Sequence, residues 1–167
     1  MDKIRNLLYQ GDKNIITQPV IRRRKYNREY GPGEYFYNQR QMAARDIERF
    51  LKVENRNVNE YEFNISKLEG LNVKVFYEMD EEWLKFILDC KSGKPHDYDV
   101  VQGPAINSMT ALWIQKYTQG KNDIEFTLRL LWRTPVYTQI CFLTDKALES
   151  IRFTGSRKFI DETSGRS

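Results

Sequence analysis

The apolar residues of this chain follow two different periods, and the two periods do not alternate regularly along the sequence. Apolar positions recur at helical spacing from Gln39 to Lys52, whereas Tyr61–Ile65 and Leu71–Val75 alternate between apolar and polar residues. A doubly wound parallel sheet needs a regular succession of strand and helix. The pattern therefore predicts an α+β fold in which strands and helices are mixed.

The other segments extend this prediction. Strands are expected at residues 5–10, 97–102, 139–143 and 151–159, and the two alternating segments are expected to form a hairpin. Further helices are expected to begin after the N-cap candidates Asp80, Asn107 or Ser108, Asn122 and Thr144, and the middle two are expected to pack antiparallel. Residues 12–33 follow neither period, which predicts a long loop, and loops of this length are usually functional or mobile.

Length and composition favour one compact unit. The 167 residues are 40% hydrophobic and 30% charged, so we expect residues 1–160 to form one domain and residues 161–167 a frayed polar tail. No apolar run has the roughly 18 residues that a membrane-spanning helix needs, so the cytoplasm is the expected compartment and no membrane partner is expected. Two cysteines and a single histidine give no metal-ligand spacing, so no metal is expected.

Positive charge is concentrated near the start of the chain. Residues 1–60 contain 13 Lys and Arg against 8 Asp and Glu, a balance of +5, whereas residues 61–167 contain 14 against 15. The densest point is the run Arg22, Arg23, Arg24 and Lys25, which is followed by several tyrosines. Such a run can bind phosphate or nucleic acid, although a charge run is more often a solvated face.

Three short segments combine glycine with polar or aromatic residues. Gln10 and Gly11 end the first expected strand, and Gly31-Pro32-Gly33 permits a tight turn before Tyr35. Gln139 alternates with Ile140 on a later strand. Each segment also has an ordinary structural explanation: a strand end, an aromatic core and a glutamine that satisfies a neighbouring backbone group.

Taken in order, these segments resemble one known family. The succession LYQG, YGPGEYF, VNEYEF, EEWLKFI, DYDVVQGPAIN, TQICFLT and KALESIRF is similar to the bacterial family catalogued as domain of unknown function 3990. The resemblance implies an ADP-ribosyltransferase-like fold, in which two small antiparallel sheets pack face to face with flanking helices and NAD lies in the cleft between them. It also implies a bacterial or phage toxin or effector that splits NAD and passes ADP-ribose to an acceptor.

The resemblance assigns roles to particular residues. Tyr35 matches the tyrosine of the family's Gly-Phe-Tyr segment and would stack on nicotinamide, while Gly31 and Gly33 shape its approach. Gln139 matches the position of a catalytic glutamate in related transferases, and Asn107 matches a recurrent polar residue of the cleft.

The remaining roles concern the ribose and the diphosphate. Gln10, followed by Gly11, stands where the family commonly has a histidine that hydrogen-bonds the adenosine ribose. Arg22, Arg23 and Arg24 are the candidates for binding the diphosphate of NAD.

Three functions remain open at this point. The first is an NAD-dependent ADP-ribosyltransferase whose acceptor is a protein, a nucleic acid or water, and which a neighbouring antitoxin could neutralise. The second is a non-catalytic binding module with the same fold, which the glutamines at positions 10 and 139 favour because an amide contributes no formal charge. The third is a nucleic-acid binder that uses the basic aromatic loop.

Overall fold

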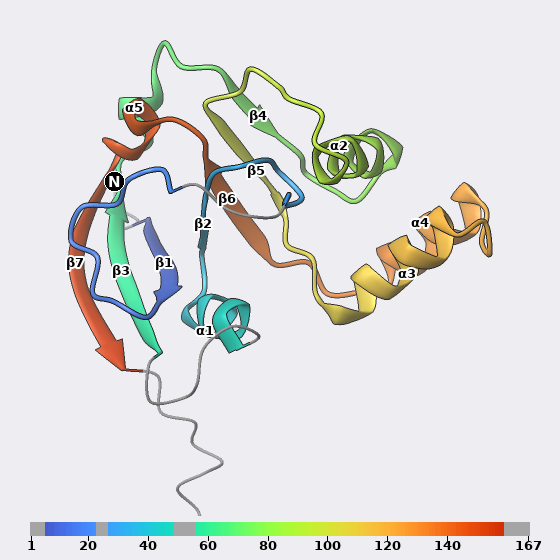
Figure 1. Cartoon of the computed structure of the whole chain (residues 1–167), viewed down its shortest axis with the longest axis horizontal. Helices are drawn as coiled ribbons and strands as arrows, with labels where there is room; N and C mark the ends of the chain where they lie inside the picture. The colour runs from blue at the N-terminus through green and yellow to red at the C-terminus, as the bar shows by residue number, and fades with distance from the viewer. Residues whose placement is uncertain (1–5, 23–26, 49–55, 159–167) are drawn as a thin grey trace, which may run out of the picture.

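The computed structural model describes residues 6–22, 27–48 and 56–158. Its mixed α+β architecture confirms the predicted class (Figure 1). Within these residues, seven strands form one sheet in the order β4-β5-β6-β2-β1-β3-β7, and only β4 and β5 are parallel to each other. The strands are β1 (Leu7–Asp12), β2 (Glu34–Tyr37), β3 (Asn57–Phe63), β4 (Val73–Val75), β5 (Val100–Pro104), β6 (Thr138–Phe142) and β7 (Ile151–Lys158).

A single residue pair, Tyr9 opposite Tyr37, joins β1 to β2 and thereby joins the two halves of this sheet. The flanking ladders are longer, since β1 pairs with β3 over six positions and β2 with β6 over four. The expectation of two separate sheets is therefore wrong, because this bridge makes the described strands one continuous sheet.

The sheet is strongly bent at this junction. Phe63 on β3 and Phe142 on β6 have ring centroids 5.9 Å apart, although three strand steps separate them. In a flat sheet, three steps of about 4.8 Å would place these strands about 14 Å apart. The two halves therefore close over one shared core of buried side chains: Leu8, Phe36, Tyr61, Phe63, Leu68, Val100, Ile140, Phe142, Ala147, Leu148 and Ile151.

The first two helices pack on the opposite face of the sheet, whereas Ala147 and Leu148 of the short helix α5 (Asp145–Leu148) belong to the shared core. The helix α1 (Arg40–Glu48) packs on β1 and β2, where Met42 and Ala43 contact Tyr37. The helix α2 (Glu81–Lys91) buries Trp83 and its neighbours in a second cluster that contains Tyr35 and Cys141. Figure 1 shows that α3 (Ser108–Thr118) and α4 (Ile124–Trp132) form an antiparallel pair at one end of the molecule, as the sequence predicts.

Most of the predicted N-caps are confirmed. The side chains of Asp80, Asn107 and Thr144 accept hydrogen bonds from the first turns of α2, α3 and α5 (Asp145–Leu148). The prediction for α4 is wrong by one residue, because the carboxylate of Asp123 accepts from Phe126 N and takes the place expected for Asn122.

The predicted hairpin is also wrong. The segment at 71–75 becomes β4, which pairs with β5, whereas β3 pairs with β1 and β7. The 3-10 turn η2 (Ile65–Leu68) and the turn at Gly70, whose φ is +83°, lead the chain away from β3. Alternation predicts that a segment is a strand but not which strand it pairs with, because pairing depends on distant residues.

The long loop after β1 lies along the sheet. The backbone carbonyls of Lys13, Asn14 and Ile16 accept hydrogen bonds of 2.8, 3.0 and 2.6 Å from side chains on β3. Residues 13–16 of the loop therefore lie over the sheet face that holds the shared core, whereas Tyr30 belongs to the cluster on the opposite face. Arg23, Arg24, the end of the helix expected to reach Lys52 and the expected tail at 161–167 lie outside the described residues.

Candidate functional site

Tyr35 and Gln139 lie on the same face of the sheet. Tyr35 is opposite Cys141 and Tyr37 is opposite Gln139 in the ladder between β2 and β6, so all four side chains point to the α1 side. Both predicted residues are buried, Tyr35 to 2% exposure and Gln139 to 1%. The structure thus brings together two of the three residues predicted to surround the ligand.

Gln10 lies on the opposite face of the sheet. It alternates with Tyr9 along β1 and therefore shares its face with Leu8, which belongs to the shared core. Its amide nitrogen donates to Glu34 Oε2 at 3.1 Å and to the backbone oxygen of Tyr35 at 3.3 Å. Gln10 thus contacts β2, but its side chain does not join those of Tyr35 and Gln139.

Arg22 is the part of the basic run that the structure describes. Its side chain forms ion pairs with carboxylates of the protein itself. Its guanidinium donates to Glu34 at 2.8 and 3.0 Å and to Asp12 at 2.6 Å. Hydrogen bonding to Glu34 raises the pKa of Arg22 above its usual value despite partial burial. A phosphate would have to compete with two carboxylates for this side chain.

The predicted glycines permit close packing. A Cβ at Gly11 would lie 2.5 Å from the backbone oxygen of Ala43, and one at Gly33 would lie 2.5 Å from Cys141 Sγ. Gly31 has a backbone φ of +103°, a value that residues other than glycine rarely adopt. These positions explain why α1 and β6 can approach β1 and β2 so closely.

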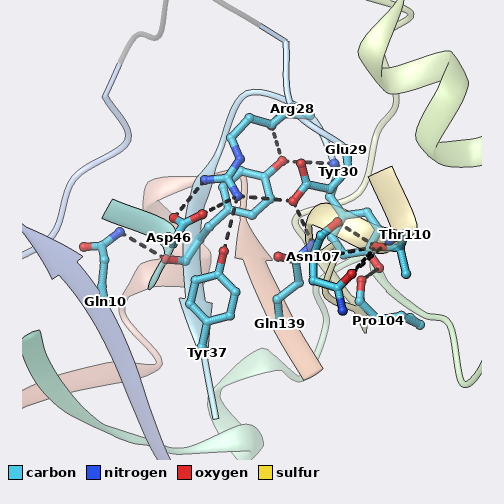
Figure 2. A network of polar contacts seen from close by, with 12 residues as sticks. Gln10, Arg28, Glu29, Tyr30, Tyr37, Asp46, Pro104, Asn107, Thr110 and Gln139 are labelled. Carbon is cyan, nitrogen blue, oxygen red and sulfur yellow. Dashed lines mark hydrogen bonds and ion pairs between the residues drawn. The ribbon is translucent and has the colours of Figure 1, made fainter. Parts of the chain in front are cut away.

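Arg28 is the central residue of a buried polar network that the sequence does not single out (Figure 2). Its guanidinium carbon lies 3.8 Å from the centroid of the Tyr35 ring. Its nitrogens donate to both oxygens of Asp46 at 3.2 Å, to Glu29 Oε1 at 3.2 Å and to the Tyr37 hydroxyl at 3.3 Å. We call Tyr35, Glu29, Asp46 and Tyr37, which surround this guanidinium, the Arg28 box.

Glu29 links this box to Gln139. Glu29 Oε1 accepts a hydrogen bond of 2.9 Å from Gln139 Nε2, and burial by itself would raise the pKa of this carboxyl. The charge of Arg28 and the hydrogen bonds outweigh burial and lower that pKa below its ordinary value. Conversely, burial disfavours the charge of Arg28, but Glu29 and Asp46 raise the Arg28 pKa well above its usual value. The network therefore holds a buried carboxylate and a buried guanidinium, both charged.

Hydrogen bonds, most of them to backbone groups, fix the positions of the Tyr35 and Tyr30 rings next to the network. The Tyr35 hydroxyl donates to Gly31 O at 2.7 Å and accepts from Tyr30 N at 3.0 Å. The Tyr30 hydroxyl in turn donates to Pro104 O and accepts from the Trp83 indole, at 2.8 and 2.9 Å. Burial raises the pKa of both tyrosines, so they remain neutral hydrogen-bonding groups at neutral pH.

A hollow of about 450 Å³ opens beside the Arg28 box. Tyr37 and Asp46 belong to both the box and the lining of this hollow. A volume of this size is typical of small-molecule sites, which range from about 300 to 1,000 Å³. We call it the α1-side hollow; its lining comprises Tyr37, Met42, Arg45, Asp46, Ile106, Asn107, Ser108 and Tyr137.

Asn107 is the predicted site residue that lines this hollow. Its side-chain oxygen accepts from Thr110 N at 2.9 Å, and Thr110 Oγ1 accepts from Asn107 N at 2.8 Å, which together form a capping box. Its structural role is therefore established, while its amide group also borders the hollow. Gln139 has a buried Oε1 for which the described residues provide no hydrogen-bond partner.

A second hollow, of about 310 Å³, is lined by Asn27, Gly31 and Pro32, which flank Tyr30 in the sequence. His96 lines it, and one imidazole nitrogen lies 2.9 Å from Tyr30 O while the other accepts from Tyr98 N at 3.1 Å. Both ring nitrogens therefore hold backbone groups in place. Asn27, Lys94 and Asp97 are among the polar residues around this hollow.

The described residues contain no group of three or more His, Cys, Asp or Glu side chains that could hold a metal ion. They also contain no helix with both the length and the apolar character needed to cross a membrane.

The fold and site define a class: a mixed α+β protein with a buried charged network beside a hollow on one face of a bent sheet. The chain belongs to the family described as protein of unknown function (DUF3990), whose model matches residues 7–153. No curated protein and no solved structure shows significant similarity to the chain.

Proposed function

We propose that the chain is an ADP-ribosyltransferase-like protein that binds NAD on the α1 side of the sheet and transfers ADP-ribose to an acceptor. Its membership of the family that the sequence resembles supports this proposal. The architecture differs from the one implied by the resemblance: the strands form one bent sheet and a packed core fills the space between its halves, so we propose the opposite face, on the α1 side, for NAD.

One observation supports the proposal most directly. The α1-side hollow lies on the sheet face that holds Tyr35 and Gln139, and Asn107 lines it. Tyr37 and Tyr137 add aromatic surface to its lining, and Arg45 adds an exposed positive charge. In this arrangement the nicotinamide would lie toward Tyr35, and the riboses and diphosphate would extend into the hollow.

The reaction needs negative charge near the ribose. The bond between the nicotinamide nitrogen and ribose C1′ breaks, nicotinamide leaves as a neutral molecule, and positive charge develops on the ribose until the acceptor bonds to C1′ and releases its proton. Hydrogen-bond-accepting oxygens and carboxylates that are already in position stabilise such a positive charge. Gln139 Oε1 is an acceptor without a hydrogen-bond partner among the described residues, and Asp46 lines the hollow, so the chain offers both an amide oxygen and a carboxylate although position 139 is not a glutamate.

The role and partners of the protein follow from the same resemblance. We propose that it acts as a toxin or effector in the bacterial or phage cytoplasm, and that a neutralising protein is a candidate partner. The acceptor is a protein, a nucleic acid or water.

A non-catalytic binding module is the second candidate, and a specific observation favours it. Gln10 lies on the other sheet face, bonded to Glu34, and Arg28 covers the Tyr35 ring. Side chains of the protein itself therefore already satisfy two of the predicted ligand contacts. A module of this kind would bind NAD or a related nucleotide without releasing nicotinamide.

Binding and turnover can be measured separately. Calorimetric titration with NAD tests binding, and chromatographic detection of nicotinamide in the presence of cell-lysate acceptors tests transfer. Asp46→Asn should weaken binding or abolish release, whereas the matched control Asp97→Asn, in the second hollow, should leave both unchanged. Binding without release would support the module, and no binding at millimolar NAD would overturn the proposal.

A further inference from the structure

The Arg28 guanidinium occupies the ring face to which the proposed function assigns nicotinamide. Its central carbon lies 3.8 Å from the Tyr35 centroid, well within the roughly 6 Å of a cation–π contact. The side chain of Arg28 is only 13% exposed. Any planar group that is to stack on this face of Tyr35 must first replace the guanidinium.

The charges of the Arg28 box suit a cation. Glu29 and Asp46 contribute two carboxylates, and the guanidinium between them contributes one positive charge. If Arg28 withdrew, an aromatic face flanked by two carboxylates would remain, and this combination binds flat cations. The pyridinium ring of NAD is itself flat and positively charged, so it matches the guanidinium in both shape and charge.

The hydrogen bonds of Arg28 are longer than those of Arg22, although the Arg22 side chain is the more exposed of the two. The four hydrogen bonds that Arg28 donates to other described side chains measure 3.2–3.3 Å, whereas Arg22 donates to its carboxylates at 2.6, 2.8 and 3.0 Å. Charge-assisted hydrogen bonds are strongest at about 2.7–2.9 Å. In addition to these long hydrogen bonds, Arg28 has its charge attraction to two carboxylates and its contact with the Tyr35 ring, two interactions that a pyridinium ring can also make.

The box and the α1-side hollow share two residues, Tyr37 and Asp46. Figure 2 shows Asp46 and the hydroxyl of Tyr37 beside Arg28, and Gln139 next to Tyr37. A ligand in the hollow thus reaches the Tyr35 ring once this one side chain has moved. Since Glu29 bonds both Arg28 and Gln139, this movement also changes the contacts of Gln139.

We propose that the Arg28 box is a binding site for a planar cation, that Arg28 is its built-in occupant, and that the pyridinium ring of NAD displaces it. The identity of the ligand rests on the proposed function, whereas the existence of the box does not. NAD binds only to molecules in which Arg28 has left the box. The apparent affinity for NAD is therefore the intrinsic affinity multiplied by the fraction of such molecules. Arg28 is thus an autoinhibitory residue.

The test removes the occupant and supplies planar cations in its place. Arg28→Ala empties the box, Arg28→Lys keeps the charge without the flat group, and Arg40→Ala is a matched control. Arg40 also lies over a tyrosine ring, 5.1 Å from the Tyr9 centroid, and pairs with Glu60, but it is more exposed. The probes are low millimolar guanidinium, the 1-methylnicotinamide cation, neutral nicotinamide and NAD, and the readouts are thermal midpoint and calorimetric affinity.

Arg28→Ala should be stabilised saturably, by several degrees, by guanidinium and by 1-methylnicotinamide, and not by neutral nicotinamide. Wild type and Arg40→Ala should show no such shift. NAD should bind Arg28→Ala at least tenfold more tightly than wild type, with Arg28→Lys between them. If Arg28→Ala does not fold alone, guanidinium present during refolding should recover it.

Failure of both cations to stabilise or recover Arg28→Ala would overturn the planar-cation site. Weaker NAD binding by Arg28→Ala than by wild type would overturn the autoinhibitory role, because Arg28 would then be part of the binding machinery. Stabilisation by both cations with no NAD binding to any variant would support the box and overturn the proposed function. The two proposals therefore fail separately.

Discussion

Replacement of Glu29 by glutamine tests the buried network directly. Glu29→Gln keeps the size of the side chain and can keep the hydrogen bond from Gln139, but it removes the charge that pairs with Arg28 at 3.2 Å. Loss of one partner of a buried ion pair costs about 3–5 kcal/mol when the other is left unpaired. Arg28 retains Asp46, so we expect a smaller loss of about 2–3 kcal/mol at pH 7.

The pH dependence separates charge from packing. The pKa of Glu29 is lower in the folded chain than its usual value of about 4.3, so the charged form stabilises the fold. This contribution is fully present above about pH 5 and is lost as the pH falls through the folded pKa. The difference between wild type and Glu29→Gln should therefore be constant from pH 7 to pH 5 and shrink below pH 4.

Urea unfolding at several pH values measures this difference. In a chain of this length, 2–3 kcal/mol corresponds to a fall in thermal midpoint of about 4–12 °C. Glu78→Gln, on an exposed glutamate, serves as the control and should change stability by less than about 0.5 kcal/mol. If the stability lost in Glu29→Gln is the same at pH 7 and at pH 3.5, the reasoning is refuted, because the loss would then come from packing and not from charge.

Three further predictions concern the fold. Gly33→Ala should destabilise the protein by several kcal/mol because its Cβ would meet backbone and sulfur atoms of β6, whereas Gly155→Ala, with open space around it, should be nearly neutral in urea unfolding. Asn107→Ala should cost about 1 kcal/mol through loss of the capping box, and equal losses for Asn122→Ala would contradict the assigned caps. Burial raises the pKa of the Cys90 thiol to about 11, so neither buried cysteine should react with a thiol reagent at pH 7.5 until denaturant is added, and rapid labelling of the native protein would disprove this burial.

Local patterns in the sequence were sufficient for much of the architecture. The apolar spacing after Gln39 predicts α1, and the caps Asp80, Asn107 and Thr144 mark three helix starts. These predictions succeed because an N-cap and an amphipathic face depend on residues within one or two turns. The expected hairpin failed because strand pairing is a long-range property.

In the candidate site, too, local sequence patterns predict some features and long-range packing decides the others. Resemblance and motif order selected Tyr35 and Gln139, and the ladder between β2 and β6 places both on one face. Gln10 was expected beside them, but alternation along β1 turns its side chain to the other face. Arg28 and Glu29 lie between the basic run and the Gly31-Pro32-Gly33 turn, so their charges could have marked them, but nothing local predicts which ring or carboxylate they meet.

The sequence by itself determined the α+β class, most helix starts and membership of the DUF3990 family, because these depend on composition, short-range periodicity and motif order. Only the tertiary structure decided that the strands form one bent sheet and that Arg28 lies on Tyr35 between two carboxylates. Asp46 comes from α1 and Gln139 from β6, and both reach this network only after distant segments pack. Stacking and burial of charge are properties of that packing, so the chemistry of the site is fixed at the tertiary level.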